Sequence, residues 1–154
     1  MSTTTKAENT GTVTNPKLDA EVREKLITAR VRMLINHAFF GTIATRLELV
    51  NADKWCPTAA TDGRKFYYNS EFVDQLSLRE TEFLIGHELL HVIYDHMGRK
   101  GDHDPMLSNI AADYCVNADL IKHGIGEEIK VVQILHDPKY YGWSYEEVYD
   151  DINQ

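Results

Sequence analysis

Apolar residues recur three or four positions apart over several parts of the chain, a spacing typical of helices that bury one face. The longest of these parts covers residues 16–47, which open with Pro16. Its apolar positions include Val22, Leu26, Ala29, Met33, Ala38 and Phe40. The sequence therefore predicts a long packing helix, with a break expected near Gly41.

The pattern changes after this helix to short apolar runs that turn-forming residues separate. The runs cover residues 47–50, 55–61 and 65–69. Asp62 and Gly63 between the last two form a strong hairpin signal. Pro57 has no amide hydrogen, so its run should begin a strand or lie at a sheet edge. We expect a small antiparallel sheet, whose edge either pairs with an extended peptide or serves only as a structural hairpin.

A second helix is predicted where the apolar content of the chain is high. Ser77 and Glu80 have the spacing of a capping box, in which each side chain bonds the other residue's backbone amide. The helix should therefore begin near Leu78. It is expected to end around Met97 and Gly98, because glycine commonly follows the last turn of a helix.

Two more helices are predicted in the last third of the chain. One covers about residues 107–122 and is closed by Gly124. The other begins at a second capping box, made by Ser144 and Glu147, and runs to about Ile152. A short helical turn is expected at residues 71–76. Residues 125–137 are expected to form a loop that packs apolar residues over the core.

The predicted elements define an α+β fold with a small antiparallel sheet, a long N-terminal helix and two central helices. A chain of 154 residues suits one domain with a core of its own. The polar residues 1–15 are expected to be a disordered tail, and residues 16–154 to form that single domain.

Composition and charge exclude several classes of function. With 24 acidic against 16 basic residues, the net charge of −8 argues against a general nucleic-acid binder. The N-terminus has no apolar region of a signal peptide or anchor, and no stretch approaches the roughly 20 apolar residues of a membrane span. We expect a cytoplasmic protein without membrane or nucleic-acid partners. Cys56 and Cys115 are then free thiols.

The most informative chemical pattern lies in the second predicted helix, where residues 87–91 read His-Glu-Leu-Leu-His. Residues four apart share one helix face, so His87 and His91 can bind one zinc ion from consecutive turns. Glu88 lies beside them and can act as general base on a zinc-activated water. The apolar neighbours favour a buried helix, which keeps metal ligands dry and fixed.

A catalytic zinc usually takes three protein ligands, so a third must come from elsewhere. The candidates are Asp95, His96, His103, Asp104, Asp113 and Cys115. His96 follows His91 by five positions and therefore lies about 140° round an intact helix. On the next helix Asn109, Asp113 and Asn117 recur every four residues and form one polar face. We predict Asp113 as the third ligand, with Asn109 and Asn117 orienting the ligands through hydrogen bonds.

This pair of helices resembles a family of zinc metallopeptidases of bacteria and phages, in which His-Glu-x-x-His-Val precedes an Asn-Ile-Ala-x-Asp-x-x-x-Asn helix. The matching stretches are residues 58–63, 86–96, 109–117 and 144–149. The resemblance implies a gluzincin-like or minigluzincin-like domain with zinc held between two helices. Family members often carry a von Willebrand factor A-like domain, which this sequence lacks. Asp113 and Asn117 also differ from the Glu-x-x-x-Asp pattern of thermolysin-like enzymes.

Together these features predict a zinc-dependent metallopeptidase that hydrolyses polypeptides, alone or with a protein partner or ATPase. The alternative is a catalytically inactive, zinc-stabilised module that sequesters a protein. Such a module would have no use for the general base Glu88. Peptidases of this type often use a His or Tyr to stabilise the oxyanion. The candidates are Tyr114, His123, His136, Tyr140 and Tyr141, of which His136 and Tyr140 are preferred because their loop could fold across the cleft.

Overall fold

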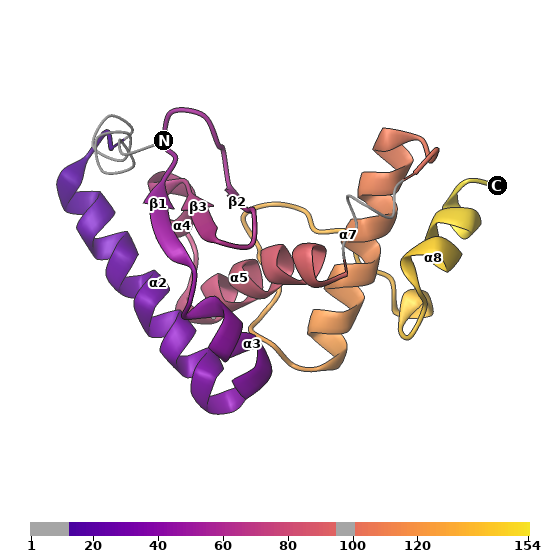
Figure 1. Cartoon of the computed structure of the whole chain (residues 1–154), viewed down its shortest axis with the longest axis horizontal. Coiled ribbons are helices and arrows are strands. Elements are labelled where there is room, and N and C mark those ends of the chain that lie inside the picture. The colour runs from indigo at the N-terminus through magenta and orange to yellow at the C-terminus, as the bar shows by residue number, and fades with distance from the viewer. Residues whose placement is uncertain (1–12, 95–100) are drawn as a thin grey trace.

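The computed structural model describes residues 13–94 and 101–154, and Figure 1 shows the arrangement of their helices and strands. In chain order these elements are α2 (Pro16–Asn36), α3 (Ala38–Ala44), β1 (Glu48–Asn51), β2 (Ala59–Thr61), β3 (Lys65–Tyr68), α4 (Ser70–Asp74), α5 (Leu78–Ile93), α7 (Pro105–Lys122), the 3-10 helix η1 (Pro138–Tyr140) and α8 (Tyr145–Ile152). The predicted α+β class is confirmed. No helix in the described ranges is both long and apolar enough to cross a membrane.

The predicted N-terminal helix is present as two helices, α2 and α3. The apolar positions in α2, Val22, Leu26, Ala29 and Met33, are buried as expected, whereas Ala38 in α3 is exposed. Asn15 caps the start of α2 by accepting a hydrogen bond from the Leu18 amide. The break lies at His37, whose backbone leaves the helical region, instead of at Gly41. Gly41 lies inside α3, in close contact with the backbone of Leu34. Residues 1–12 of the predicted tail are outside the described residues.

The small sheet has three strands in the order β1-β3-β2. The predicted hairpin is present, because β2 and β3 are antiparallel and joined through Asp62 and Gly63, the latter with a positive φ of 91°. The expectation of an all-antiparallel sheet is wrong, since β1 pairs with β3 in parallel. After β1 the chain reverses direction and forms β2. It then reverses again, and β3 lies between β1 and β2, parallel to the first and antiparallel to the second. Strand β2, which follows Pro57, is therefore an edge strand.

Helix α5 begins as predicted at a capping box between Ser77 and Glu80. The second carboxylate oxygen of Glu80 accepts a hydrogen bond from the Lys130 amide at 2.8 Å, so one side chain both caps α5 and anchors a later loop. Helix α5 ends at Ile93, earlier than expected. Gly98, predicted to close it, lies outside the described residues.

Two hydrophobic clusters lie on either side of α7. The larger one joins α2, the sheet and α5 to the C-terminal half of α7, where Val116 and Leu120 are fully buried. The smaller one packs α8 against Ala111 and Ala112 of α7. Figure 1 shows α5 crossing between α2 and α7, with α8 on the far side of α7. This packing holds α5 and α7 in contact. Along α7, Asp113 follows Ala112 of the smaller cluster and precedes Val116 of the larger one.

A loop that we call the strap, residues 126–136, runs from the start of α5 to the middle of α7. At one end the Glu127 amide bonds the Arg79 carbonyl at 3.1 Å. A side chain at Gly126 would meet that carbonyl at 2.4 Å, so only glycine allows this contact. At the other end the Leu135 carbonyl accepts a hydrogen bond from Asn117 at 2.9 Å. The strap is the predicted loop over the core, fixed at both ends.

Candidate metal centre

Helices α5 and α7 bring three predicted ligands together. Nε2 of His91 lies 3.0 Å from Nε2 of His87 and 3.0 Å from Oδ1 of Asp113. Nε2 of His87 lies 3.3 Å from the same Asp113 oxygen. Their candidate ligand atoms all lie within 4.8 Å of one another, and among the described residues this is the group of His, Cys, Asp and Glu side chains suited to a metal ion.

The spacing of these three atoms fits zinc. A zinc ion with bonds of about 2.0–2.1 Å and tetrahedral geometry holds its ligand atoms about 3.3–3.4 Å apart. The observed separations are within a few tenths of an ångström of that value. Two imidazoles and one carboxylate also form a donor set that zinc accepts in catalytic sites, where a fourth position stays open. The residues present therefore fit a zinc ion without rearrangement of the backbone.

Asn117 orients one of these side chains from α7. Its carbonyl oxygen lies 2.8 Å from Nδ1 of His87, and the pairing favours the tautomer with a proton on Nδ1 and a free electron pair on Nε2. Asn117 is buried, and its amide nitrogen donates to the Leu135 carbonyl. Asn109, predicted for the same role, is exposed on the surface of α7. The structure thus brings one of the two asparagines to the group.

Close packing of α5 on α7 sets this geometry. Gly86, immediately before His87, faces Leu120 of α7, and a side chain there would approach a Leu120 methyl at 2.8 Å. Since Gly86 has no side chain, the two helices come close enough for His87 to meet Asp113 and Asn117. The residue before the motif is therefore part of the reason that the ligands converge.

The charges of the group are strongly coupled. Burial alone would lower the pKa of His87, but its hydrogen bond with Asp113 and the negative charge of Glu88 raise that pKa above its ordinary value. Burial would raise the pKa of Asp113, but hydrogen bonds and charges from His87 and His91 hold it well below its usual range. Asp113 is therefore a carboxylate at neutral pH. Because a cation would replace the proton favoured on His87, metal binding and protonation compete.

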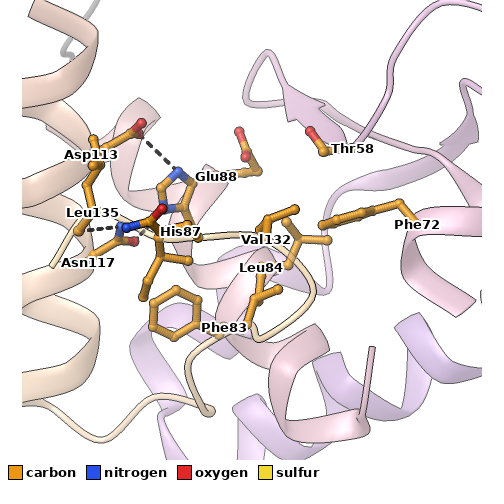
Figure 2. A pocket seen from close by; sticks show the side chains of 13 residues that line it. Thr58, Phe72, Phe83, Leu84, His87, Glu88, Asp113, Asn117, Val132 and Leu135 are labelled. Carbon is orange, nitrogen blue, oxygen red and sulfur yellow. Dashed lines mark hydrogen bonds and ion pairs between the residues drawn. The ribbon is translucent and has the colours of Figure 1, made fainter. Parts of the chain in front are cut away.

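Glu88 lies next to the group and lines a cavity between α5, the strap and the turn before β2. Figure 2 shows its carboxylate between the His87–Asp113 pair and Thr58. Within the described part of the chain, no hydrogen bond or ion pair engages this carboxylate. Burial raises the pKa of Glu88 above its ordinary value, although positive charge on His87 and His91 acts to lower it. A partly buried carboxylate with these properties is suited to exchange protons with a substrate or water.

Comparison with known proteins identifies the family. A family model described as "Putative metallopeptidase domain" matches residues 21–154. The chain belongs to this family. The match covers both helices that carry the grouped residues, and it confirms the expected membership of a metallopeptidase family. No curated protein and no solved structure matches the chain.

Two further candidates in this metallopeptidase domain do not line the cavity. The Tyr140 hydroxyl donates to Asp151 at 2.7 Å, and burial together with this bond raises the pKa of Tyr140 to about 12. His136 bonds the Tyr141 hydroxyl at 2.9 Å and lies 3.5 Å from a Glu128 oxygen. Neither preferred oxyanion candidate lines the cavity.

Other residues considered as metal ligands also lie outside the group. His103 stacks on Tyr149 and bonds the Tyr145 hydroxyl at 2.8 Å, so it joins α8 to the loop before α7. Cys115 is buried, and its thiol lies 3.8 Å from the Trp143 carbonyl. Asp95 and His96 are outside the described residues.

The structure adds cavity residues that the sequence did not single out. Phe83 and Leu84 line the cavity, and they precede His87 by four and three positions on the same helix. Helical spacing alone could have placed them on the face of His87. The strap residues Val132 and Leu135 carried no such signal, because nothing in an irregular loop tells which helix it will cross.

Proposed function

We propose that this metallopeptidase domain is a zinc-dependent peptidase, with His87, His91 and Asp113 as metal ligands and Glu88 as the general base. The observation that carries the proposal is the position of Glu88. Its carboxylate lies beside three converging ligand atoms and faces a cavity, free of other bonds within the described residues. A site that only stabilised the fold would tend to close its fourth position with Cys or His and would have no use for this base.

The bound zinc would supply Lewis acidity, which polarises a peptide carbonyl and lowers the pKa of a water molecule. Glu88 takes the proton from the attacking water and later gives it to the leaving amine. Its raised pKa brings it closer to neutrality and so suits it to both transfers. Asn117 holds the His87 ring through Nδ1, which keeps Nε2 directed at the metal position.

The sheet offers a way to bind the polypeptide substrate. Strand β2 contacts α5 and has one edge without a partner strand in the described sheet. Thr58, one residue before β2, lines the cavity next to Glu88. An extended peptide that adds to this edge by backbone hydrogen bonds would pass beside the Glu88 carboxylate. This supports the interpretation of the edge as a binding element.

The proposal can be tested by metal depletion and refilling. The protein is purified, its zinc content is measured, and a peptide library is incubated with native, chelator-treated and zinc-refilled samples. We expect new peptide termini, detected by mass spectrometry, with native and refilled protein only. Stoichiometric zinc without any cleavage would instead favour the alternative, an inactive module that sequesters a protein. A protein that binds no zinc would contradict both.

A further inference from the structure

The cavity beside Glu88 continues away from the ligand group as an apolar pocket. The whole cavity, including its end at the ligand group, has a volume of about 170 Å³. Away from the polar end at His87, Glu88, Asp113 and Asn117, its walls are mainly hydrocarbon and come from α4, α5 and the strap, with Thr58 before β2 and Gln133 as polar members. Figure 2 shows Phe72, Leu84 and Val132 lining this end, on the side of Glu88 away from Asp113.

The volume matches one side chain. An apolar cavity of about 150 Å³ stays dry and binds one benzene molecule, whereas pockets for drug-sized ligands have about 300–1,000 Å³. A cavity of about 170 Å³ therefore suits one phenyl or branched aliphatic group better than a drug-sized ligand. The carboxylates of Glu88 and Asp113 at one end disfavour a negative charge, and burial of any unpaired charge is costly.

The position of the pocket relates it to the reaction. A peptide whose scissile bond lies at Glu88 has neighbouring Cα atoms only about 3.8 Å apart, so a side chain next to that bond reaches the pocket. We propose that this pocket selects substrates with a leucine- to phenylalanine-sized apolar side chain adjacent to the cleaved bond. This inference rests on the proposed function and adds its substrate class. Val132 on the strap is then a specificity-determining residue.

Two neighbouring valines provide a matched test. Val131 and Val132 are 44% and 43% exposed on the strap, but only Val132 lines the pocket. Val132→Trp should fill the pocket, whereas Val131→Trp adds the same bulk outside it. Exposure of both side chains means that neither change disturbs the core. The assay measures kcat/KM of the zinc-loaded proteins on peptides with Gly, Ala, Leu, Phe or Asp at either residue flanking the cleaved bond.

Each methylene that an apolar pocket accepts changes kcat/KM by about 10-fold or more. Wild type should therefore cleave the Leu and Phe peptides at least about 10-fold better than the Gly peptide. Val132→Trp should lower this ratio toward 1, and Val131→Trp should leave it as in wild type. As a complement, Leu84→Ala enlarges the pocket and should shift the preference from Leu toward Trp.

A binding measurement separates failure of the pocket from failure of the proposed function. Benzene should shift the methyl NMR signals of Leu84 and Val132 in wild type, and should leave the Leu84 signal unchanged in Val132→Trp. Cleavage without side-chain preference, or an unchanged ratio in Val132→Trp, overturns the pocket and leaves the peptidase standing. Benzene binding without cleavage of any peptide overturns the peptidase and the role of the pocket in substrate choice. Absence of benzene binding overturns the pocket itself.

Discussion

Asn117 links the candidate metal centre to the strap, and its substitution tests both bonds at once. Its oxygen accepts from His87 Nδ1 at 2.8 Å, its nitrogen donates to the Leu135 carbonyl at 2.9 Å, and the residue is 3% exposed. Asn117→Ala removes both bonds and leaves two groups unsatisfied. At about 1–2 kcal/mol for each, the free energy of unfolding of the metal-free protein should fall by about 2–4 kcal/mol. Zinc affinity should fall about 10- to 100-fold, because His87 loses the group that orients its ring.

Asn117→Asp separates the two bonds. The carboxylate still accepts from His87, so zinc affinity should stay within about threefold of wild type or increase. It cannot donate to the Leu135 carbonyl, so the metal-free protein should still lose about 1–2 kcal/mol of stability. Zinc affinity is measured by competition with a chromophoric chelator, and stability by urea unfolding. Asn109→Ala, on the exposed face of the same helix, is the matched control and should behave as wild type.

The reasoning would be refuted if Asn117→Ala bound zinc as tightly as Asn109→Ala. It would also be wrong if Asn117→Asp lost as much zinc affinity as Asn117→Ala, since the effect would then come from disruption of α7 and not from the bond to His87.

Three other predictions concern the metal and the fold. Asp113→Ala should lower zinc affinity by at least about 10-fold with helix content unchanged, as measured by chelator competition and circular dichroism, and an unaltered affinity would exclude Asp113 as a ligand. The zinc affinity of wild type should decrease as pH falls, because protons compete with zinc for His87, whose pKa is raised. Isothermal titration calorimetry should detect proton release when zinc binds. Absence of proton release would contradict the competition between zinc and protons. Burial alone would raise the pKa of Asp53, but hydrogen bonds from Ser70 outweigh this effect, and the pKa is lowered. The Asp53 carboxylate therefore stabilises the fold at pH values above its unfolded pKa. This stabilisation is lost as the pH falls through the lower folded pKa. Asp53→Asn should therefore cost about 1–3 kcal/mol in urea unfolding at pH 7, with the difference from wild type shrinking below about pH 4; a constant difference would argue against the charge.

Much of the fold could be predicted because local signals determine it. The capping boxes at Ser77 and Ser144 fixed two helix starts, and both were found where expected. Asp62-Gly63 placed the hairpin. The parallel pairing of β1 with β3 could not be predicted from the sequence. It depends on which strand of the β2–β3 hairpin lies beside β1, and this is decided by tertiary packing. The helix break was misplaced for a similar reason: glycine permits a break, but Gly41 is used for close packing.

The candidate site shows the same division between local and long-range information. Helical spacing was enough to bring His87 and His91 to one face and to single out Asp113 on the next helix. It could not distinguish Asn109 from Asn117, which have the same spacing from Asp113 in opposite directions. Only the contact of α7 with α5 and the strap decides that Asn117 is buried beside His87 and that Asn109 is exposed. The pocket formed by the strap depends on tertiary packing in the same way.

The central claim is that Glu88 serves as the general base for peptide hydrolysis at a metal held by His87, His91 and Asp113. The most direct test is kcat/KM of Glu88→Gln relative to wild type on one cleaved peptide, with both proteins at the same measured zinc content. We predict a loss of at least about 100-fold without loss of zinc, since the amide binds no proton at neutral pH. A Glu88→Gln protein that carries the same zinc and cleaves at the wild-type rate would contradict the claim.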